Sequence, residues 1–152
     1  MNTDLHGWFS QRQLRIHADC ADPLSVDRHS LNLLSERVIG ACYEVSNSLG
    51  GGFLERVYQK ALLAEFEIRG IAAVTEAAYP VEYKGRRVGE YFADLVVEGV
   101  LLVETKCVEG FRDEHVAQCL NYLKASGLEL CLLVNFRRAR VEIKRVIKSQ
   151  NL

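Results

Sequence analysis

Apolar side chains recur at helical spacing in three stretches of the chain. Over residues 31–49 and 53–69 an apolar residue falls every three or four positions, which predicts two helices that each bury one face. Gly50 ends the first of them, because glycine allows the sharp turn that follows many helices. The same spacing over residues 113–126, ended by Gly127, predicts a third helix.

Shorter apolar runs predict the strands. Six strands are expected, at residues 78–83, 87–92, 95–97, 100–103, 130–136 and 141–147. The first two alternate apolar and polar positions, as exposed strands do, whereas the run at 130–136 predicts a strand buried on both faces. This order of elements, with the third helix between the fourth and fifth strands, predicts an α/β fold with a mixed central sheet flanked by helices.

The two apolar runs that flank Gly99 predict a β-hairpin that brings charged side chains together. Because side chains alternate along a strand, Glu104 and Lys106 share one face and Thr105 points to the other. A three-residue loop, with Gly99 in the left-handed conformation, sets Asp94 directly opposite Glu104. A two-residue loop would place the two acids on opposite faces. We expect the three-residue loop.

These charged residues suit a divalent cation. Two carboxylates one strand apart can hold Mg²⁺ or Mn²⁺, which prefer oxygen ligands, and the backbone carbonyl of Thr105 is a further candidate ligand. Lys106 would lie beside a metal-bound water, where it can orient or deprotonate that water or neutralise charge on a phosphate. Solvated side chains at strand ends are the simpler interpretation. It fits less well, because charged groups that interrupt apolar strands are seldom left unpaired.

Glu55, Gln118 and Tyr122 are further candidates with competing structural explanations. Glu55 falls in the first turn of the second predicted helix, where the helix dipole alone favours an acid. In the third predicted helix, Gln118 and Tyr122 share a face with His115. Gln118 can hydrogen-bond a phosphate and Tyr122 can position one. For His115 we prefer an ordinary surface role.

The composition is that of one globular domain, but its charge is unevenly distributed. The chain has 152 residues, of which 49% are hydrophobic and 26% charged, and a net charge of −1. Between residues 135 and 152, however, there are six basic residues and one acid. Such an end can contact phosphates or form a solvated strand and tail, and both interpretations stay open. The candidates for nucleic-acid contact are Arg137, Arg138, Arg140, Lys144 and Arg145.

Other features exclude several classes of protein. The five cysteines have no C-x-x-C spacing, so we expect no zinc or iron–sulfur site and interpret them as small, mostly buried side chains in a reducing compartment. No apolar run approaches the roughly 18 residues of a membrane span, and the polar start is not a secretory signal. We expect a cytoplasmic protein with an N-terminal arm of uncertain order at residues 1–30 and one domain at residues 31–152.

Several motifs together resemble a known group of nucleases. The pattern of Asp94, nine residues and then Glu-Thr-Lys resembles the active site of the PD-(D/E)XK nuclease superfamily, whose αβββαβ core has the predicted order of elements. GFLERVY, residues 52–58, resembles the signature of the GxxExxY family within it. The further strings that resemble this family are VIGACYEV, YKGRRVGE, ADLVVE, LNYLKASGL and LLVNF. Gln118 and Tyr122 also match the Q-x-x-x-Y pattern of the RecB-like and lambda-exonuclease-like branches.

The resemblance implies roles for the candidate residues. It implies metal ligands at Asp94 and Glu104, a catalytic lysine at Lys106, an acid that completes the metal site at Glu55, and supporting residues at Gln118 and Tyr122. Two positions depart from the family pattern. Gly51 stands where relatives often have proline, and Ser46 stands where they often have histidine. If that histidine helps to bind substrate or metal, binding is weaker in this chain.

The leading hypothesis is a nuclease, dependent on Mg²⁺ or Mn²⁺, that hydrolyses phosphodiester bonds in DNA rather than RNA. The alternative is a catalytically silent module with the nuclease fold that binds nucleic acid or a protein partner. A third hypothesis is an interaction protein whose N-terminal arm docks on a partner or on a second copy of the chain. A glycoside hydrolase with two carboxylates fits poorly, because it leaves Lys106 unexplained.

Overall fold

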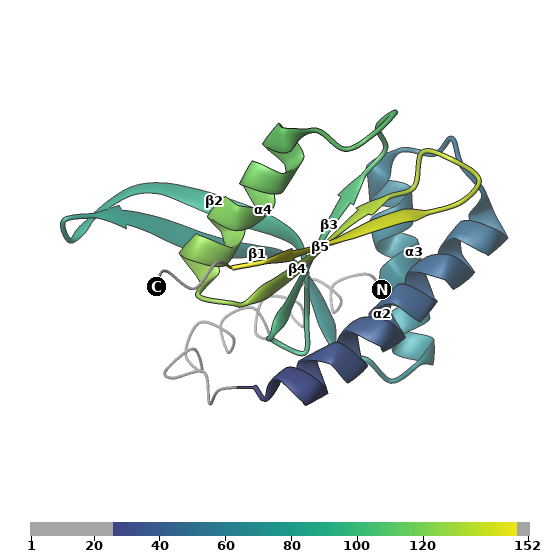
Figure 1. The fold of residues 1–152 in the computed structure, drawn as a ribbon, viewed down its shortest axis with the longest axis horizontal. Helices are drawn as coiled ribbons and strands as arrows, with labels where there is room; N and C mark the ends of the chain where they lie inside the picture. Colours follow the sequence, from purple (N-terminus) through teal and green to yellow (C-terminus); the bar gives the residue numbers. More distant parts are fainter. Residues whose placement is uncertain (1–25, 149–152) are drawn as a thin grey trace, which may run out of the picture.

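The computed structural model describes residues 26–148, and Figure 1 shows how their helices and strands are arranged. In chain order these are α2 (Arg28–Leu49), α3 (Glu55–Ile68), β1 (Ala73–Tyr83), β2 (Arg86–Val97), β3 (Leu101–Lys106), α4 (Asp113–Ser126), β4 (Leu130–Asn135) and β5 (Glu142–Ile147). Nearly all of the arm predicted at residues 1–30 lies outside the described residues. No helix in the described range is long and apolar enough to cross a membrane.

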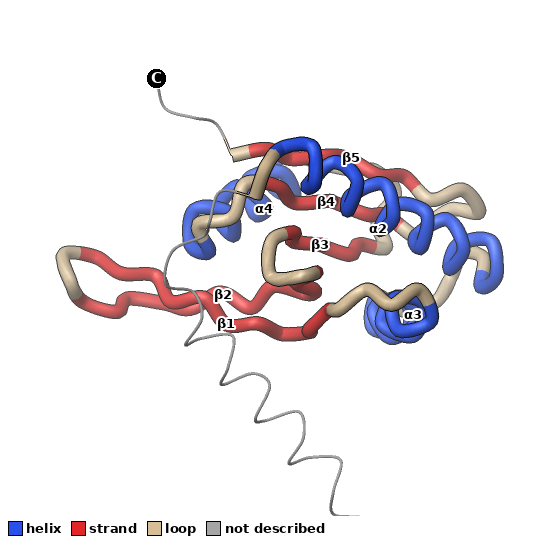
Figure 2. Tube along the Cα trace, turned by 90° about the horizontal axis from the view of Figure 1, so that it is seen from below, coloured by secondary structure: helices blue, strands red, loops and turns tan. Residues whose placement is uncertain are grey.

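The five strands of residues 26–148 form one mixed sheet in the order β1-β2-β3-β4-β5. The strands β3 and β4 run parallel, and the other neighbouring pairs are antiparallel. The helices α2 and α3 pack on one face, and α4, which connects β3 to β4, packs on the other. Figure 2 shows the sheet from another side, with α2 crossing in front of the strands. The predicted fold class, a mixed sheet flanked by helices, is confirmed.

The core lies on both faces of the two central strands. All of β4 is buried, and so is β3 up to Thr105. A larger cluster beneath α2 and α3 contains Tyr58 and Phe136, whose rings stack with centroids 4.5 Å apart, and a smaller cluster beneath α4 contains Leu123. Each such side chain contributes about 1.5–3 kcal/mol when it is fully buried. The sheet end that carries the candidate residues is therefore held by a packed core on either side.

The ends of the helices follow from local chemistry. The helix α2 begins at Arg28, three residues before its predicted start, because Asp27 caps it. The Asp27 carboxylate accepts hydrogen bonds from the His29 and Ser30 N–H groups at 2.7 and 3.1 Å, an arrangement worth about 1 kcal/mol. The helix α4 has its predicted bounds and ends at Gly127, which adopts the left-handed conformation.

Two predictions about the hairpin strands were wrong. Residues 87–92 and 95–97 were expected to form separate strands, but they belong to the single strand β2, so the sheet has five strands and not six. In addition, β1 begins at Ala73, five residues before its predicted start at residue 78. The reason is that main-chain pairing continues through residues 73–77 of β1 and through Ala93 and Asp94 of β2. The side chains there, mostly small or half-buried, form no apolar run that would mark a strand.

The ladder between β1 and β2 is interrupted at two positions. Its register shifts between Val81 and Glu82, in the outer part of the hairpin, and a second interruption lies next to a candidate residue. There the register skips the pair formed by Glu76 and Asp94, and Glu76 has a φ of 53°, which is costly for a residue other than glycine. The alternation of faces also changes here. Leu95 packs in the cluster beneath α2 and α3, whereas Ala93, two residues earlier, packs in the cluster beneath α4. Regular alternation would place both on the same face.

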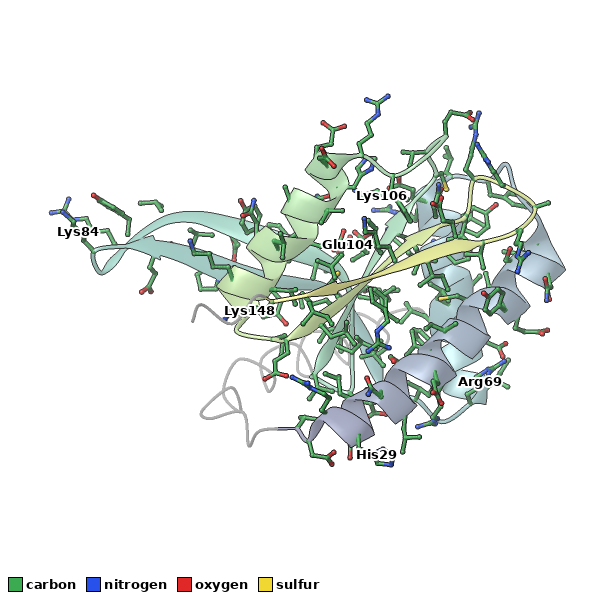
Figure 3. All side chains as sticks on the ribbon, viewed as in Figure 1. His29, Arg69, Lys84, Glu104, Lys106 and Lys148 are labelled. Atoms are coloured by element: carbon green, nitrogen blue, oxygen red, sulfur yellow. The ribbon has the colours of Figure 1, made fainter. Side chains whose placement is uncertain are left out.

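Beyond this irregularity the hairpin of β1 and β2 leaves the body of the domain. Figure 1 shows it projecting past α4. Every residue of the outer part of β2, residues 86–92, is exposed. Lys84, at the tip, lies far from the labelled Glu104 and Lys106 in Figure 3. The hairpin thus has a part built into the sheet and a part that stands free of it.

Candidate active site

The hairpin of β2 and β3 sets Asp94 opposite Glu104, as predicted. Its register pairs Leu95 with Val103 and leaves a three-residue loop, in which Gly99 has a φ of 70°. The Asp94 N–H group donates to Glu104 Oε1 at 3.1 Å. The predicted loop length and the left-handed Gly99 are therefore confirmed, and the Glu104 carboxylate reaches the main chain of Asp94 on the neighbouring strand.

Successive side chains of β3 reach opposite faces of the sheet. Lys106 Nζ donates to Gln118 Oε1 on α4 at 2.8 Å. Thr105 Oγ1, on the other face, accepts from Gln59 Nε2 on α3 at 3.0 Å. Figure 3 shows the labelled Glu104 and Lys106 together beside α4. The predicted alternation of these residues holds in the structure.

Main-chain N–H groups hold three carboxylates around the end of β3. Asp94 Oδ2 accepts from the Thr105 N–H at 2.9 Å and also from the Thr105 hydroxyl at 3.0 Å. Glu104 accepts from the Asp94 N–H, and Glu55 Oε1 accepts from the Cys107 N–H at 3.2 Å. The structure therefore brings Glu55, from the start of α3, to the same strand end as the two hairpin acids.

The candidate residues of α4 form a chain of hydrogen bonds that begins at Lys106. Gln118 accepts from the lysine and donates through Nε2 to Tyr122 Oη at 3.3 Å. Burial, followed by the nearby Glu104 charge, raises the pKa of Tyr122 to about 12, so the phenol stays neutral. His115 is not part of this chain, because its Nδ1 accepts from the Arg112 N–H and caps the helix. Gln118 and Tyr122 thus fix the position of the lysine head group.

Glu104 is the most deeply buried acid of the group, with 1% of its surface exposed. Burial, and then the charge of Asp94, raise its pKa to about 9. In the absence of a cation, burial therefore favours the protonated form of Glu104 at neutral pH. A cation bound between Glu104 and Asp94 would favour the ionised form, because its charge opposes both effects.

The oxygen atoms of this cluster fit a Mg²⁺ or Mn²⁺ ion. Within residues 26–148, no three Asp, Glu, His or Cys side chains are grouped so that they could hold a metal ion. Mg²⁺, however, usually takes one or two carboxylates and completes its shell with waters and other oxygens. Asp94 and Glu104 supply two carboxylates, and no ion pair between described residues neutralises either. The carbonyl of Lys106 accepts from the Phe136 N–H of the β4 side, so the preceding carbonyl, that of Thr105, points toward β2.

A pocket of about 650 Å³ opens beside the acids. Glu55 and Asp94 line it, together with Gln59 and two arginines, Arg56 and Arg137. The side chain of Arg137 is 50% exposed and pairs with an exposed acid, Glu109, at 2.8 Å. The pocket is thus lined by both acids and cations, the two kinds of group that a phosphate bound together with a metal ion would contact.

The five basic residues predicted to contact nucleic acid do not share one surface. Arg137 lines the pocket, and Arg138, in the same loop, donates to the main chain beyond β3 at 3.1 Å. Arg140 is exposed in the loop between β4 and β5. Lys144 and Arg145 are neighbours in β5 and so point to opposite faces. Arg145 donates to two polar side chains of α2, at 2.6 and 2.8 Å, which gives it a structural partner.

Two residues that support the site were missed by the sequence analysis. Gln59 follows Glu55 by one helical turn, and that spacing could have indicated a shared face. Asn135 is 2% exposed and ties the chain after β3 to the end of β4, since its amide accepts from the Val108 N–H at 3.1 Å and donates to the Val108 carbonyl at 2.7 Å. Its sequence signal is a single polar residue in an otherwise apolar run.

The two departures from the family pattern both face the loop between β4 and β5. A Cβ atom at Gly51 would lie 2.5 Å from the Arg137 carbonyl oxygen, so no side chain fits there along this path of the backbone. Ser46 is buried, and its hydroxyl donates to the Ala139 carbonyl at 3.4 Å. The small residues at these positions therefore allow this loop to lie close to the end of α2.

The free cysteines fit the predicted role only in part. Cys42, Cys119 and Cys131 are buried, as expected, whereas Cys107 is partly exposed and lines the pocket. Among the described residues no cysteine forms a disulfide.

Comparison with known proteins shows the family of the chain. The family model of the PD-(D/E)XK nuclease superfamily matches residues 32–146. The crystal structure of SSO0001 has the same fold, with a TM-score of 0.51 and 15% identity over 99% of this chain and 81% of that chain. An alkaline exonuclease from Laribacter hongkongensis gives a TM-score of 0.48 and 14% identity over 95% of this chain and 82% of that chain. No curated protein matches. Since the family model spans most of the chain, the protein belongs to the PD-(D/E)XK nuclease superfamily.

Proposed function

We propose that the protein is a nuclease that hydrolyses phosphodiester bonds in DNA with the help of a bound Mg²⁺ or Mn²⁺ ion. The observation that carries this proposal is the placement of Asp94, Glu104 and Lys106 where the C-terminal end of β3 lies beside the middle of β2. Within the superfamily, the GFLERVY stretch supports membership of the GxxExxY family, and Gln118 with Tyr122 supports a relation to the RecB-like and lambda-exonuclease-like branches.

Asp94, Glu104 and the Thr105 carbonyl are the proposed metal ligands, and Glu55 completes the site from α3. When bound, such an ion polarises the phosphate and lowers the pKa of a coordinated water. The chain prepares the ligands by holding one oxygen of each carboxylate with main-chain N–H groups. The second oxygen of each carboxylate is the one proposed to face the ion.

Lys106 is the proposed catalytic lysine. Its ammonium is held at 2.8 Å by Gln118, whose amide is in turn fixed by Tyr122. From this position the lysine can donate a hydrogen bond to a phosphate oxygen or orient the attacking water, and it can neutralise charge that develops on the phosphorus oxygens. Arg56 and Arg137, on the pocket wall, are proposed to hold the flanking phosphates.

A cleavage assay tests this proposal directly. Wild type, Lys106→Ala and the control Lys124→Ala would be incubated with DNA in Mg²⁺, Mn²⁺ or EDTA. Lys124 is an exposed lysine on α4 and serves as the matched control. We expect metal-dependent cutting by wild type and the control, and a rate about 10²–10⁴-fold lower for Lys106→Ala, as for loss of one catalytic group. Equal cutting by Lys106→Ala, or cutting in EDTA, would refute the assignment.

The second candidate function is a silent module that binds DNA without cutting it. The observation that favours it is the lack, within residues 26–148, of three side-chain metal ligands in one group. Titration of Mn²⁺ into wild type and Glu104→Gln separates the two functions. A nuclease should bind Mn²⁺ and lose that binding in Glu104→Gln. Salt-sensitive DNA binding without Mn²⁺ binding or cutting would instead favour the silent module.

A further inference from the structure

The candidate acids that line the pocket are each preceded by an exposed phenylalanine. Phe53 stands two residues before Glu55, and Phe92 stands two residues before Asp94. Both rings line the same pocket as the acids, and they come from different parts of the fold, the loop before α3 and the strand β2. The two residues are 47% and 55% exposed. The Phe53 ring packs edge-on against the buried Tyr58 ring, with centroids 6.1 Å apart, and about half of its surface is still open.

A third apolar side chain extends this surface. Leu54 also lines the pocket and is 79% exposed. Single exposed apolar side chains are ordinary on protein surfaces, but a group of them in one concave site marks a binding surface. We name Phe53, Leu54 and Phe92 the apolar wall of the pocket. A site for phosphate and metal ion alone does not require such a wall.

The charged residues that line the pocket indicate what kind of ligand would contact the apolar wall. Arg56 pairs with Glu76 at 3.7 Å, and both side chains are largely exposed, at 75% and 70%. An exposed pair of this kind is worth roughly 0–1 kcal/mol, so the arginine can exchange its partner for a phosphate at little cost. The pocket therefore combines cations, acids suited to a metal ion and an apolar wall. A nucleic-acid strand offers the matching groups, namely phosphates and flat apolar bases.

We propose that this pocket receives an unpaired strand of DNA, with bases stacked against Phe92 and Phe53 while a phosphate lies at the acids. The inference rests on the proposed function and adds the substrate class. In an intact duplex the faces of the bases are covered by their neighbours, so the apolar wall would meet only the sugar-phosphate backbone. In a single strand the faces are free, and an aromatic ring can cover any base regardless of sequence.

The test measures stacking and affinity without cutting. All proteins would carry Lys106→Ala, so that the oligonucleotide stays intact, and titrations would be run in Mn²⁺. The ligands are a single-stranded DNA that carries 2-aminopurine, the same sequence as a duplex closed by loops at both ends, and the corresponding RNA strand. The variants are Phe92→Ala, Phe92→Tyr and the control Tyr43→Ala, which removes an aromatic side chain that is 42% exposed on α2 and outside the pocket lining.

We expect the single strand to bind more tightly than the closed duplex and the RNA, and its 2-aminopurine fluorescence to change on binding. Loss of one stacking ring, at about 1–3 kcal/mol per base, should weaken binding of the single strand by Phe92→Ala roughly 5- to 150-fold. Phe92→Tyr and Tyr43→Ala should bind as the parent does. The fluorescence change should also shrink in Phe92→Ala, which a merely structural loss of charge contacts would not cause.

Four results would overturn the inference. These are equal or tighter binding of the closed duplex, tighter binding of RNA, unchanged affinity of Phe92→Ala, and an equal loss in Tyr43→Ala. Because cutting is not measured here, this failure is distinct from failure of the proposed function. A protein that cuts DNA with metal but shows no effect of Phe92→Ala would remain a nuclease with a different substrate preference.

Discussion

The two halves of β2 lie in different surroundings although they are one continuous strand. The inner half, residues 93–97, is buried apart from Asp94 and lies between β1 and β3. The outer half, residues 86–92, is exposed along its length and pairs with β1 alone. Phe92 and Asp94, which line the pocket, stand on either side of the boundary.

This contrast shows that one strand can combine a backbone fixed by the core with side chains that are open to solvent. The buried half fixes the backbone on which Asp94 is mounted, because Leu95, Val96 and Val97 pack in the cores on the two faces. The exposed half contributes side chains to the surface without being part of either core. A residue at the boundary, such as Asp94, therefore has a fixed backbone on one side and exposed side chains on the other.

The first prediction tests how strongly the buried part of the site disfavours charge. Burial raises the pKa of Glu104 in the folded state to about 9, from an ordinary value of 4.5, so between these values the folded state holds a proton that the unfolded state has released. Stability of the metal-free protein should therefore be highest at low pH and fall as pH rises, by at most about 4 kcal/mol from pH 5 to pH 8. Urea unfolding in EDTA across this range measures the fall. In Glu104→Gln the fall should be much smaller, and an equal fall would contradict this account.

A pair of substitutions compares the two halves directly. Leu95→Ala, in the inner half, should lower the free energy of unfolding by about 2–5 kcal/mol, because it leaves a cavity at a fully buried position. Val88→Ala, in the outer half, should change it by less than about 0.5 kcal/mol, since Val88 is 62% exposed. Chemical denaturation of the two variants and wild type is the measurement. Similar losses would show that the outer half is packed against something in solution.

The smallest expected effect concerns the irregular position at the boundary. In a regular strand, valine is favoured over glycine by up to about 1 kcal/mol. At residue 76, where φ is 53°, the order should be reversed, because a β-branched residue is strained there and glycine is not. Glu76→Gly should therefore be more stable than Glu76→Val by roughly 1 kcal/mol. If valine proves the more stable, β1 has a regular conformation at this residue in solution.

The sequence predicts most of what packing and turn chemistry determine. The helix at residues 113–126 and the buried strand at residues 130–136 were clear from apolar spacing, and the loop of the second hairpin followed from Gly99. That loop in turn gave the facing position of Asp94 and Glu104. Each of these features depends on residues close together in the chain, so local patterns were enough.

Features that depend on contacts between residues far apart in the chain could not be predicted from the sequence. Nothing in the sequence marks Glu76 as left-handed, and its conformation coincides with a gap in the ladder with β2. The contact of Arg145 with α2 joins residues more than a hundred positions apart. From the sequence alone, a basic residue at this position is equally consistent with a phosphate contact. The two halves of β2 were predicted as separate strands because Ala93 and Asp94, which stand between them, interrupt the apolar pattern.

The main-chain donors that hold the acids have a consequence for mutational tolerance. The three carboxylates are anchored by N–H groups of residues 94, 105 and 107, and every amino acid except proline supplies such a group. Sequence drift at Cys107, for example, can change the side chain without removing the donor that holds Glu55. The anchoring of the site is thus largely insulated from the identity of its neighbours, which leaves the lining of the pocket free to diversify around it.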